Sequence, residues 1–212
     1  MLPPDCPEKI GIPVKNHLFM LMRIFMEPEI LTERLLLRRP TVSDITEEYI
    51  QWMNNPDVNR FLEVRHRRHT RESCAAYVKM RRENSQLGLH FGVFANHGKL
   101  FIGTVTFNGF HALYKTADIS FVIGHPQAQR KGYATEAVAG ACRFAFREQG
   151  LFKVTGGHYA NNIESLRVFQ KNGFHIEGIL RAQHVNAEGV RGDSIVHGLL
   201  ATEFESFHSQ QA

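Results

Sequence analysis

The chain has 212 residues, of which 43% are hydrophobic and 22% are charged, and its net charge is +4. This is an ordinary soluble composition, and the length supports one domain with a substantial core. The mild positive charge suits an anionic ligand, whereas no run of Lys and Arg is long enough to favour nucleic acid. Three scattered cysteines form no disulfide framework, which favours the reducing cytoplasm. The histidines show no zinc-binding spacing, so no metal is expected.

Residues 1–28 are expected to form a poorly structured N-terminal extension without a catalytic role. The apolar run at 18–22 is too short to cross a bilayer, and no signal-peptide cleavage site is clear. Membrane binding is therefore not expected. The functional domain is expected over residues 29–212.

The predicted elements of this domain are defined by periodicity, capping residues and turn residues. Strands are predicted over residues 31–39, 89–95, 100–107, 116–123, 152–159, 174–184 and 193–204. Helices are predicted over 45–53 with Thr41 or Ser43 as the N-cap, over 74–83 after a cap at Thr70, over 135–146, and over 163–172. The order predicts an α/β or α+β domain.

The most informative stretch is the loop between the strand at 116–123 and the helix at 135–146. It consists of Gln129, Arg130, Lys131, Gly132, Tyr133 and Ala134. Loop amides and the first amides of the helix would converge on one point, where the helix dipole favours negative charge. Gly132 allows a positive φ and a close approach of the backbone. The pattern predicts a pyrophosphate site, although the loop is neither a dinucleotide GxGxxG nor a Walker A motif.

A second motif follows the strand that ends at Tyr159. Asn162 and Ser165 lie in the first turn of the next predicted helix, which closes at Asn172-Gly173. With this motif the sequence resembles the GNAT superfamily of acetyl-CoA-dependent N-acetyltransferases. The glycine loop is similar to its acyl-CoA signature, and the Asn-x-x-Ser…Lys-x-Gly-Phe stretch to its second CoA element. Residues 31–38 and the later 177–193 resemble the Rim-type branch, which includes enzymes that acetylate protein N-termini. The resemblance spans roughly residues 29–205.

The resemblance implies a single domain with a mixed, twisted sheet of about seven strands and helices on both faces. Its two central strands should splay apart. Acetyl-CoA is the implied co-substrate, and the chain is expected to be a monomer or homodimer. The residues expected to bind acetyl-CoA are the six loop residues together with Val122, Ile123, Thr135, Asn162, Ser165 and Lys171.

The implied chemistry is direct attack of a neutral amine on the thioester, which needs a base, oxyanion donors and an acid for the sulfur. Amides around Val122 and Ile123 are the expected oxyanion donors. The resemblance favours Ser165 as the acid, and Tyr159 is the alternative. His184 and Asp118 are the candidate bases. A free imidazole titrates at about pH 6.5, which suits a histidine to proton removal at neutral pH. A water chain without a single base stays open.

A helix-to-loop segment is expected to form a wall of the acceptor pocket. Its candidate residues are Trp52, Asn55, Arg60, Phe61 and Glu63. The segment also resembles GNAT enzymes that acetylate amino groups on nucleotide sugars, while Trp52 and Phe61 can equally be core residues. The acceptor is therefore open between a protein α-amine and a small amine such as an amino nucleotide sugar, a polyamine or an antibiotic. A non-catalytic acyl-CoA-binding module is the alternative from another class.

Overall fold

The computed structural model describes residues 27–84, 87–96, 98–186 and 188–209. The expected extension over residues 1–28 therefore lies outside the described residues, apart from its last two. The strands are β1 (Ile30–Leu31), β2 (Leu36–Arg38), β3 (His90–Ala95), β4 (Leu100–His111), β5 (Thr116–Ile123), β6 (Lys153–Tyr159), β7 (His175–Val185) and β8 (Arg191–Leu200). The α-helices are α2 (Glu47–Asn54), α3 (Pro56–Asn59), α4 (Arg71–Glu83), α5 (Tyr133–Arg147), α6 (Ile163–Lys171) and α7 (Ala201–Ser209), and short 3₁₀ turns are η1 (Val42–Asp44), η2 (Glu63–His66) and η4 (Pro126–Ala128). No helix in these ranges has the length and apolar character needed to cross a membrane.

The strands of the described residues form one mixed sheet of eight strands in the order β1-β2-β3-β4-β5-β6-β8-β7. The sheet has one strand more than expected because the first predicted strand, 31–39, folds back on itself as β1 and β2. The turn is closed by Thr32, whose amide donates to the Leu35 carbonyl at 3.0 Å and whose hydroxyl oxygen accepts from the Leu35 amide at 3.0 Å. A threonine side chain that satisfies a nearby amide stabilises such a local turn.

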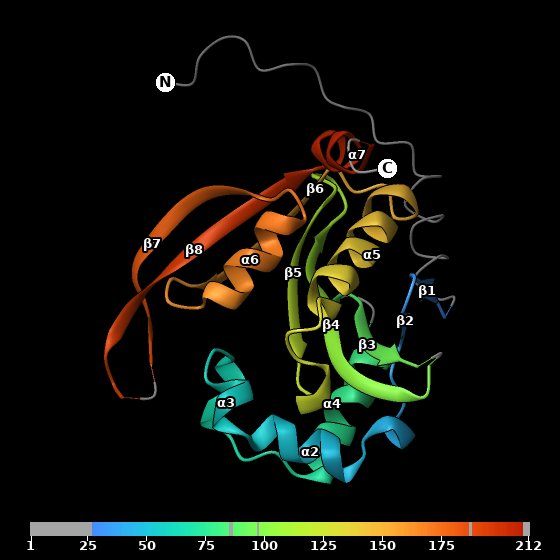
Figure 1. Cartoon of the computed structure of the whole chain (residues 1–212), viewed down its shortest axis with the longest axis vertical. Coiled ribbons are helices and arrows are strands. Elements are labelled where there is room, and N and C mark those ends of the chain that lie inside the picture. The colour runs from blue at the N-terminus through green and yellow to red at the C-terminus, as the bar shows by residue number, and fades with distance from the viewer. Residues whose placement is uncertain (1–26, 85–86, 97, 187, 210–212) are drawn as a thin grey trace.

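The centre of the sheet is split between β5 and β6 (Figure 1). These two strands pair in parallel only where Thr116–Asp118 of β5 lies beside Lys153–Thr155 of β6. Beyond that point β5 continues against β4, and β6 continues against β8. The splayed central strands expected from the family resemblance are therefore confirmed.

Helices cover both faces of the sheet, as expected. The larger core lies under α5, α6 and α7, where Phe144, Phe169 and Phe204 are buried. The smaller core lies under α2 and α4 on the opposite face, and it includes Trp52. Val122 packs against this smaller core. Since β5 contributes to both cores, its position is fixed from both sides.

Among the predicted boundaries that differ from the structure, two are set by capping side chains. The first helix begins after Thr46, whose hydroxyl oxygen accepts from the Tyr49 amide at 3.2 Å, whereas Thr41 caps the short turn η1 instead. The last strand ends at Leu200, and residues 201–204 start α7. The Glu203 carboxylate accepts from the Leu200 amide at 2.8 Å. An acidic side chain three residues after the N-cap that accepts from the N-cap amide stabilises a helix start. The apolar residues around it were predicted as a continuation of the strand.

Candidate active site

The glycine loop has the backbone needed for anion binding. Arg130 and Gly132 both adopt a positive φ, at 59° and 79°. Gly132 is the N-cap of α5 and provides no side-chain hydrogen bond to the helix. The amides of Tyr133, Ala134 and Thr135 are the first of the helix, and such amides have no partner within a helix. Their donors and the helix dipole can therefore act on a bound anion.

The open edge of β5 supplies a backbone donor next to this loop. The Gly124 amide donates to the Ile102 carbonyl of β4 at 2.9 Å. Because successive amides of an antiparallel strand point to opposite sides, the Val122 amide points at β4 and the Ile123 amide points into the gap. Of the two expected donors, only Ile123 presents its amide to the gap. Gln129 reaches the Ile123 carbonyl with its side-chain amide at 3.4 Å.

The start of α6 carries the second motif. The Asn162 side-chain oxygen accepts from the Ser165 amide at 3.1 Å, so Asn162 caps the helix and its oxygen is already used. The half-buried Ser165 hydroxyl makes no hydrogen bond within the described ranges. At the other end of α6, the Asn172 side chain donates to the Thr135 carbonyl at 3.3 Å. This contact brings Lys171, the last residue of α6, close to the first turn of α5.

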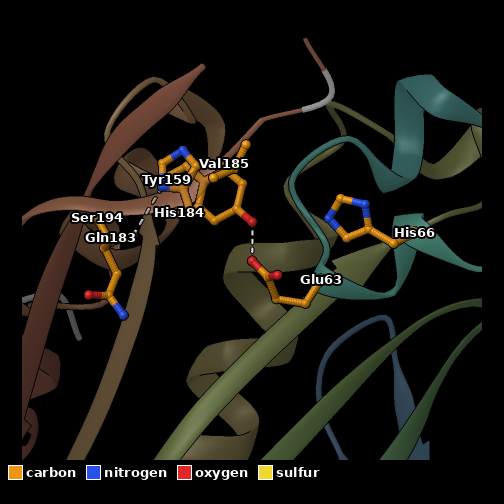
Figure 2. A pocket seen from close by; sticks show the side chains of 7 residues that line it. All are labelled: Glu63, His66, Tyr159, Gln183, His184, Val185 and Ser194. Atoms are coloured by element: carbon orange, nitrogen blue, oxygen red, sulfur yellow. Dashed lines mark hydrogen bonds between the residues drawn. The ribbon is translucent and has the colours of Figure 1, made fainter. Parts of the chain in front are cut away.

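A polar pocket opens between η2 and the β7–β8 hairpin (Figure 2). Its cavity volume is about 430 Å³, within the range that holds a small ligand. The Tyr159 hydroxyl donates to the Glu63 carboxylate and accepts from Arg65 at 2.8 Å. His184 stacks on the Tyr159 ring. The lining residues are Glu63, His66, Tyr159, Gln183, His184, Val185 and Ser194.

Comparison with known proteins assigns the domain. The sequence model of the acetyltransferase (GNAT) domain matches residues 34–175. This chain belongs to the GNAT family. It is an N-acetyltransferase.

Individual relatives of this GNAT domain agree with the assignment. YoaA, an uncharacterized N-acetyltransferase of Bacillus subtilis, is 29% identical over 183 residues, which cover 82% of this chain and 98% of YoaA. A spermidine N-acetyltransferase from Vibrio cholerae, solved with CoA and spermine, has a TM-score of 0.72 at 19% identity and covers 82% of this chain and 99% of its own. A proposed ribosomal-protein-serine acetyltransferase from Vibrio cholerae has a TM-score of 0.65 at 24% identity, with coverage of 82% and 99%.

The electrostatics of the GNAT pocket keep the Tyr159 phenol protonated. Burial, and then its hydrogen bond to Glu63, raise the pKa of Tyr159 above the ordinary value, although Arg65 opposes them. A neutral phenol can donate a proton but cannot accept one at its oxygen without becoming a cation. Tyr159 is therefore a possible acid or an orienting donor, and it is not a base at neutral pH.

The second candidate base, Asp118, lies outside this pocket. It is opposite Thr155, at the last pair between β5 and β6, and the Thr155 hydroxyl donates to its carboxylate at 3.3 Å. Partial desolvation raises the pKa of the Asp118 carboxyl above its ordinary value, although the residue is exposed to solvent. Four residues of strand, roughly 13 Å, separate Thr155 from Tyr159 along β6. The structure thus brings His184, and not Asp118, to the Glu63–Tyr159 pair.

The expected acceptor wall is divided between the pocket and the core. Phe61 meets the Tyr159 ring edge-on at 6.0 Å, and the Arg60 guanidinium lies 4.9 Å from the centre of the Phe61 ring. Trp52 is only 3% exposed and belongs to the smaller core. Asn55 caps α3 through the Asp57 amide at 3.0 Å. Trp52 and Asn55 thus have structural contacts and do not line the pocket of Glu63 and His184. Their place in an acceptor wall stays a prediction.

Sequence reasoning did not identify five residues at or behind the pocket surface: Arg65, His66, Gln183, Val185 and Ser194. Arg65 and His66 belong to a basic stretch that looks like a solvated loop in sequence. Gln183 lies at a register shift of β7, where strand alternation no longer tells which face a side chain occupies. No local pattern marks these positions, because the pocket exists only where two distant segments meet.

Proposed function

We propose that this protein transfers an acetyl group from acetyl-CoA to a primary amine by direct attack. The pyrophosphate would bind at the start of α5, with Lys171 nearby, and the pantetheine would run along the open edge of β5. The observation that carries this proposal is the separation of β5 from β6 beyond Asp118 and Thr155, beside a helix start without a side-chain cap. The gap opens towards the ends of both strands, where β5 leads into the glycine loop and β6 ends at Tyr159 of the pocket.

The position of each proposed residue assigns it one step of the reaction. The Ile123 amide would stabilise the oxyanion, since its N–H points into the gap. His184 would take the proton from the attacking amine, because it lies in the pocket beside Glu63. Ser165 would protonate the departing thiolate from the first turn of α6, and Tyr159 is the alternative acid. Asp118 and ordered water remain the alternatives for the base.

The pocket favours an acceptor with one amine. Among its seven lining residues Glu63 is the only carboxylate, and it already accepts from Tyr159. Several ammonium groups would need several anionic or acceptor groups, so a polyamine is disfavoured. We propose the α-amine of a peptide as the first candidate, since α-amines have a pKa of about 7.7–8.0 and need less deprotonation than a Lys amine at about 10.4. An amino nucleotide sugar, whose polar groups suit Gln183 and Ser194, is the second.

The test is a thiol-release assay with acetyl-CoA against N-terminal peptides, 4-amino nucleotide sugars, aminoglycosides and polyamines. We expect release with a peptide or a nucleotide sugar and little with spermidine. Release with spermidine alone would overturn the acceptor class. Tight CoA binding without thiol release for any amine would support a non-catalytic acyl-CoA-binding module instead.

A further inference from the structure

The turn between β1 and β2 packs directly on the first turns of α5. Thr32 lies so close to Gly140 that a Cβ at that glycine would come within 2.7 Å of the threonine methyl group. The Thr32 hydroxyl donates to one oxygen of the Glu136 carboxylate at 2.6 Å. The Arg34 amide donates to the same oxygen at 2.7 Å. The turn is therefore fixed to α5 through its own backbone, at the Arg34 amide, and through its own side chain, at Thr32.

The Arg34 side chain then joins this turn to the glycine loop. Its Nε donates to the second Glu136 oxygen at 2.6 Å, and its Nη1 donates to the Lys131 carbonyl at 3.1 Å. The guanidinium also lies over the Tyr133 ring, 4.6 Å from its centre. Arg34 thus contacts three parts of the same loop and helix start.

These contacts set the direction of a loop amide. In a planar trans peptide the carbonyl and the following N–H point in opposite directions. Because Arg34 holds the Lys131 carbonyl, the Gly132 amide must point away from the guanidinium. Gly132 has a φ of 79° and is the N-cap of α5, so this amide adds a donor to those of the helix start. A loop that is already in this conformation loses less entropy when it binds a ligand.

Arg34 also compensates a charge that would oppose an anion. Glu136 lies in the first turn of α5 with its side chain 15% exposed. A carboxylate there interacts favourably with the helix dipole, but it would repel a bound phosphate group. Burial would raise the pKa of the Glu136 carboxyl, yet its bonds from Thr32 and Arg34 lower it, so it stays ionised. The guanidinium is then the cation that balances it.

We infer that Arg34 is a positioning residue for the phosphates of acetyl-CoA, which acts by holding the Lys131 peptide and by neutralising Glu136. The inference rests on the proposed function, because it requires CoA to bind at the glycine loop. It assigns a role in binding to a residue of the β1–β2 turn, which lies outside the loop itself.

The test is calorimetric titration of CoA into the full chain and its variants. We expect Arg34→Met to weaken CoA binding about tenfold, in line with the loss of charge-assisted hydrogen bonds. Arg34→Lys should fall between Arg34→Met and wild type, because it keeps the charge but loses the planar fork. Arg34→Met/Glu136→Gln should recover to within about threefold of wild type. Because calorimetry reports the affinity of the folded fraction, a role in folding alone would lower the number of binding sites and leave the affinity unchanged.

The matched control is Arg147→Met, which removes another two-bond Arg–Glu contact, with Glu205 at 2.7 and 2.8 Å, on the last turn of α5. It should leave the CoA affinity unchanged.

CoA affinity within twofold of wild type for Arg34→Met, or a double variant as weak as Arg34→Met, would overturn the inference. If Arg34→Met does not fold, Glu136→Gln alone decides: it should bind CoA at least as tightly as wild type, and weaker binding would contradict the charge argument. A wild-type protein that does not bind CoA would instead overturn the proposed function.

Discussion

The imidazole of His184 lies flat against the phenol ring of Tyr159, with the ring centres 3.5 Å apart and the planes 3° from parallel. Its Nδ1 lies 3.3 Å from the Ser194 hydroxyl. Its Nε2 lies over Gly192, where a Cβ would approach within 2.6 Å. The ring is therefore held in one orientation at the pocket wall.

If His184 is the base, His184→Ala should lower kcat/KM by about 10²-fold and remove the acidic limb of its pH profile. His184→Gln should not restore the rate, because an amide cannot accept the proton. Asp118→Asn should have the smaller effect. His66→Ala is the matched control, since His66 lines the same pocket, and it should keep the limb. An unchanged profile in His184→Ala would move the role to Asp118 or to water.

Ser165→Ala should lower kcat by about 10²–10⁴-fold with little change in the KM for acetyl-CoA, as expected for an acid that acts in the transition state. The helix cap should survive, because Asn162 accepts from the backbone amide of Ser165 and not from its hydroxyl. The melting temperature should therefore stay at the wild-type value. Wild-type kcat in this variant would assign the acid to Tyr159 or to solvent.

Gly132→Asp should weaken CoA binding by about two orders of magnitude, because it adds negative charge and a side chain where the phosphates are proposed to bind. Calorimetry on the folded variant measures this effect. Gly109→Asp is the control for backbone strain alone: its φ is also positive, at 58°, and its Cβ would lie in open space. It should lose stability similarly but keep its CoA affinity. Equal CoA affinity in the two variants would contradict the site.

The buried pair of His158 and His197 should make the fold sensitive to acid. Nε2 of His158 lies 3.0 Å from Nε2 of His197, so the two nitrogens share one hydrogen bond and cannot both carry a proton there. Burial, and then His158, lower the pKa of His197 to about 4. The unfolded chain binds protons at about pH 6.5, so the free energy of unfolding should fall as the pH drops from 6.5 towards 4, by roughly 3 kcal/mol.

Urea unfolding at pH 7.5 and pH 5 measures about 2 kcal/mol of that loss, because pH 5 lies 1.5 units below 6.5. His197→Leu removes the titrating ring, so its free energy of unfolding should change less between the two pH values than that of wild type. Burial also lowers the pKa of His90, to about 3, and its share of the loss should persist in the variant. An identical pH dependence in wild type and His197→Leu would contradict the assignment.

Local sequence determined the order of most elements and the conformation of the glycine loop. A positive φ at Gly132 and a cap at Thr70 depend on neighbouring residues, so their signals lie within a few positions of each other. The same holds for Asn162, whose capping role could be read from its place before the helix. The predicted start of the first helix and the predicted end of the last strand were wrong, because the capping side chains of Thr46 and Glu203 set those boundaries.

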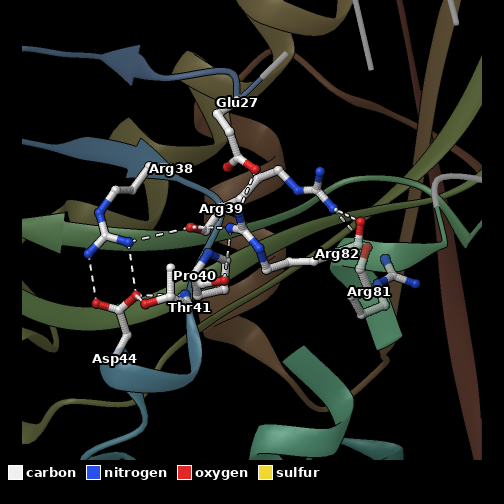
Figure 3. A network of polar contacts seen from close by, with 8 residues as sticks. All are labelled: Glu27, Arg38, Arg39, Pro40, Thr41, Asp44, Arg81 and Arg82. Carbon is white, nitrogen blue, oxygen red and sulfur yellow. Dashed lines mark hydrogen bonds and ion pairs between the residues drawn. The ribbon is translucent and has the colours of Figure 1, made fainter. Parts of the chain in front are cut away.

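Tertiary structure alone decided which distant residues meet. Arg39 donates to the carbonyls of Arg81 and Arg82 at 3.0 and 2.8 Å, so a residue that follows β2 completes the end of α4 (Figure 3). Glu63 and Tyr159 form their hydrogen bond although 96 residues separate them in the chain. Such pairs follow from how the layers pack, and packing is set by all the buried side chains together. The sequence by itself therefore determined the family and the conformation of the glycine loop, and the tertiary structure decided the pocket.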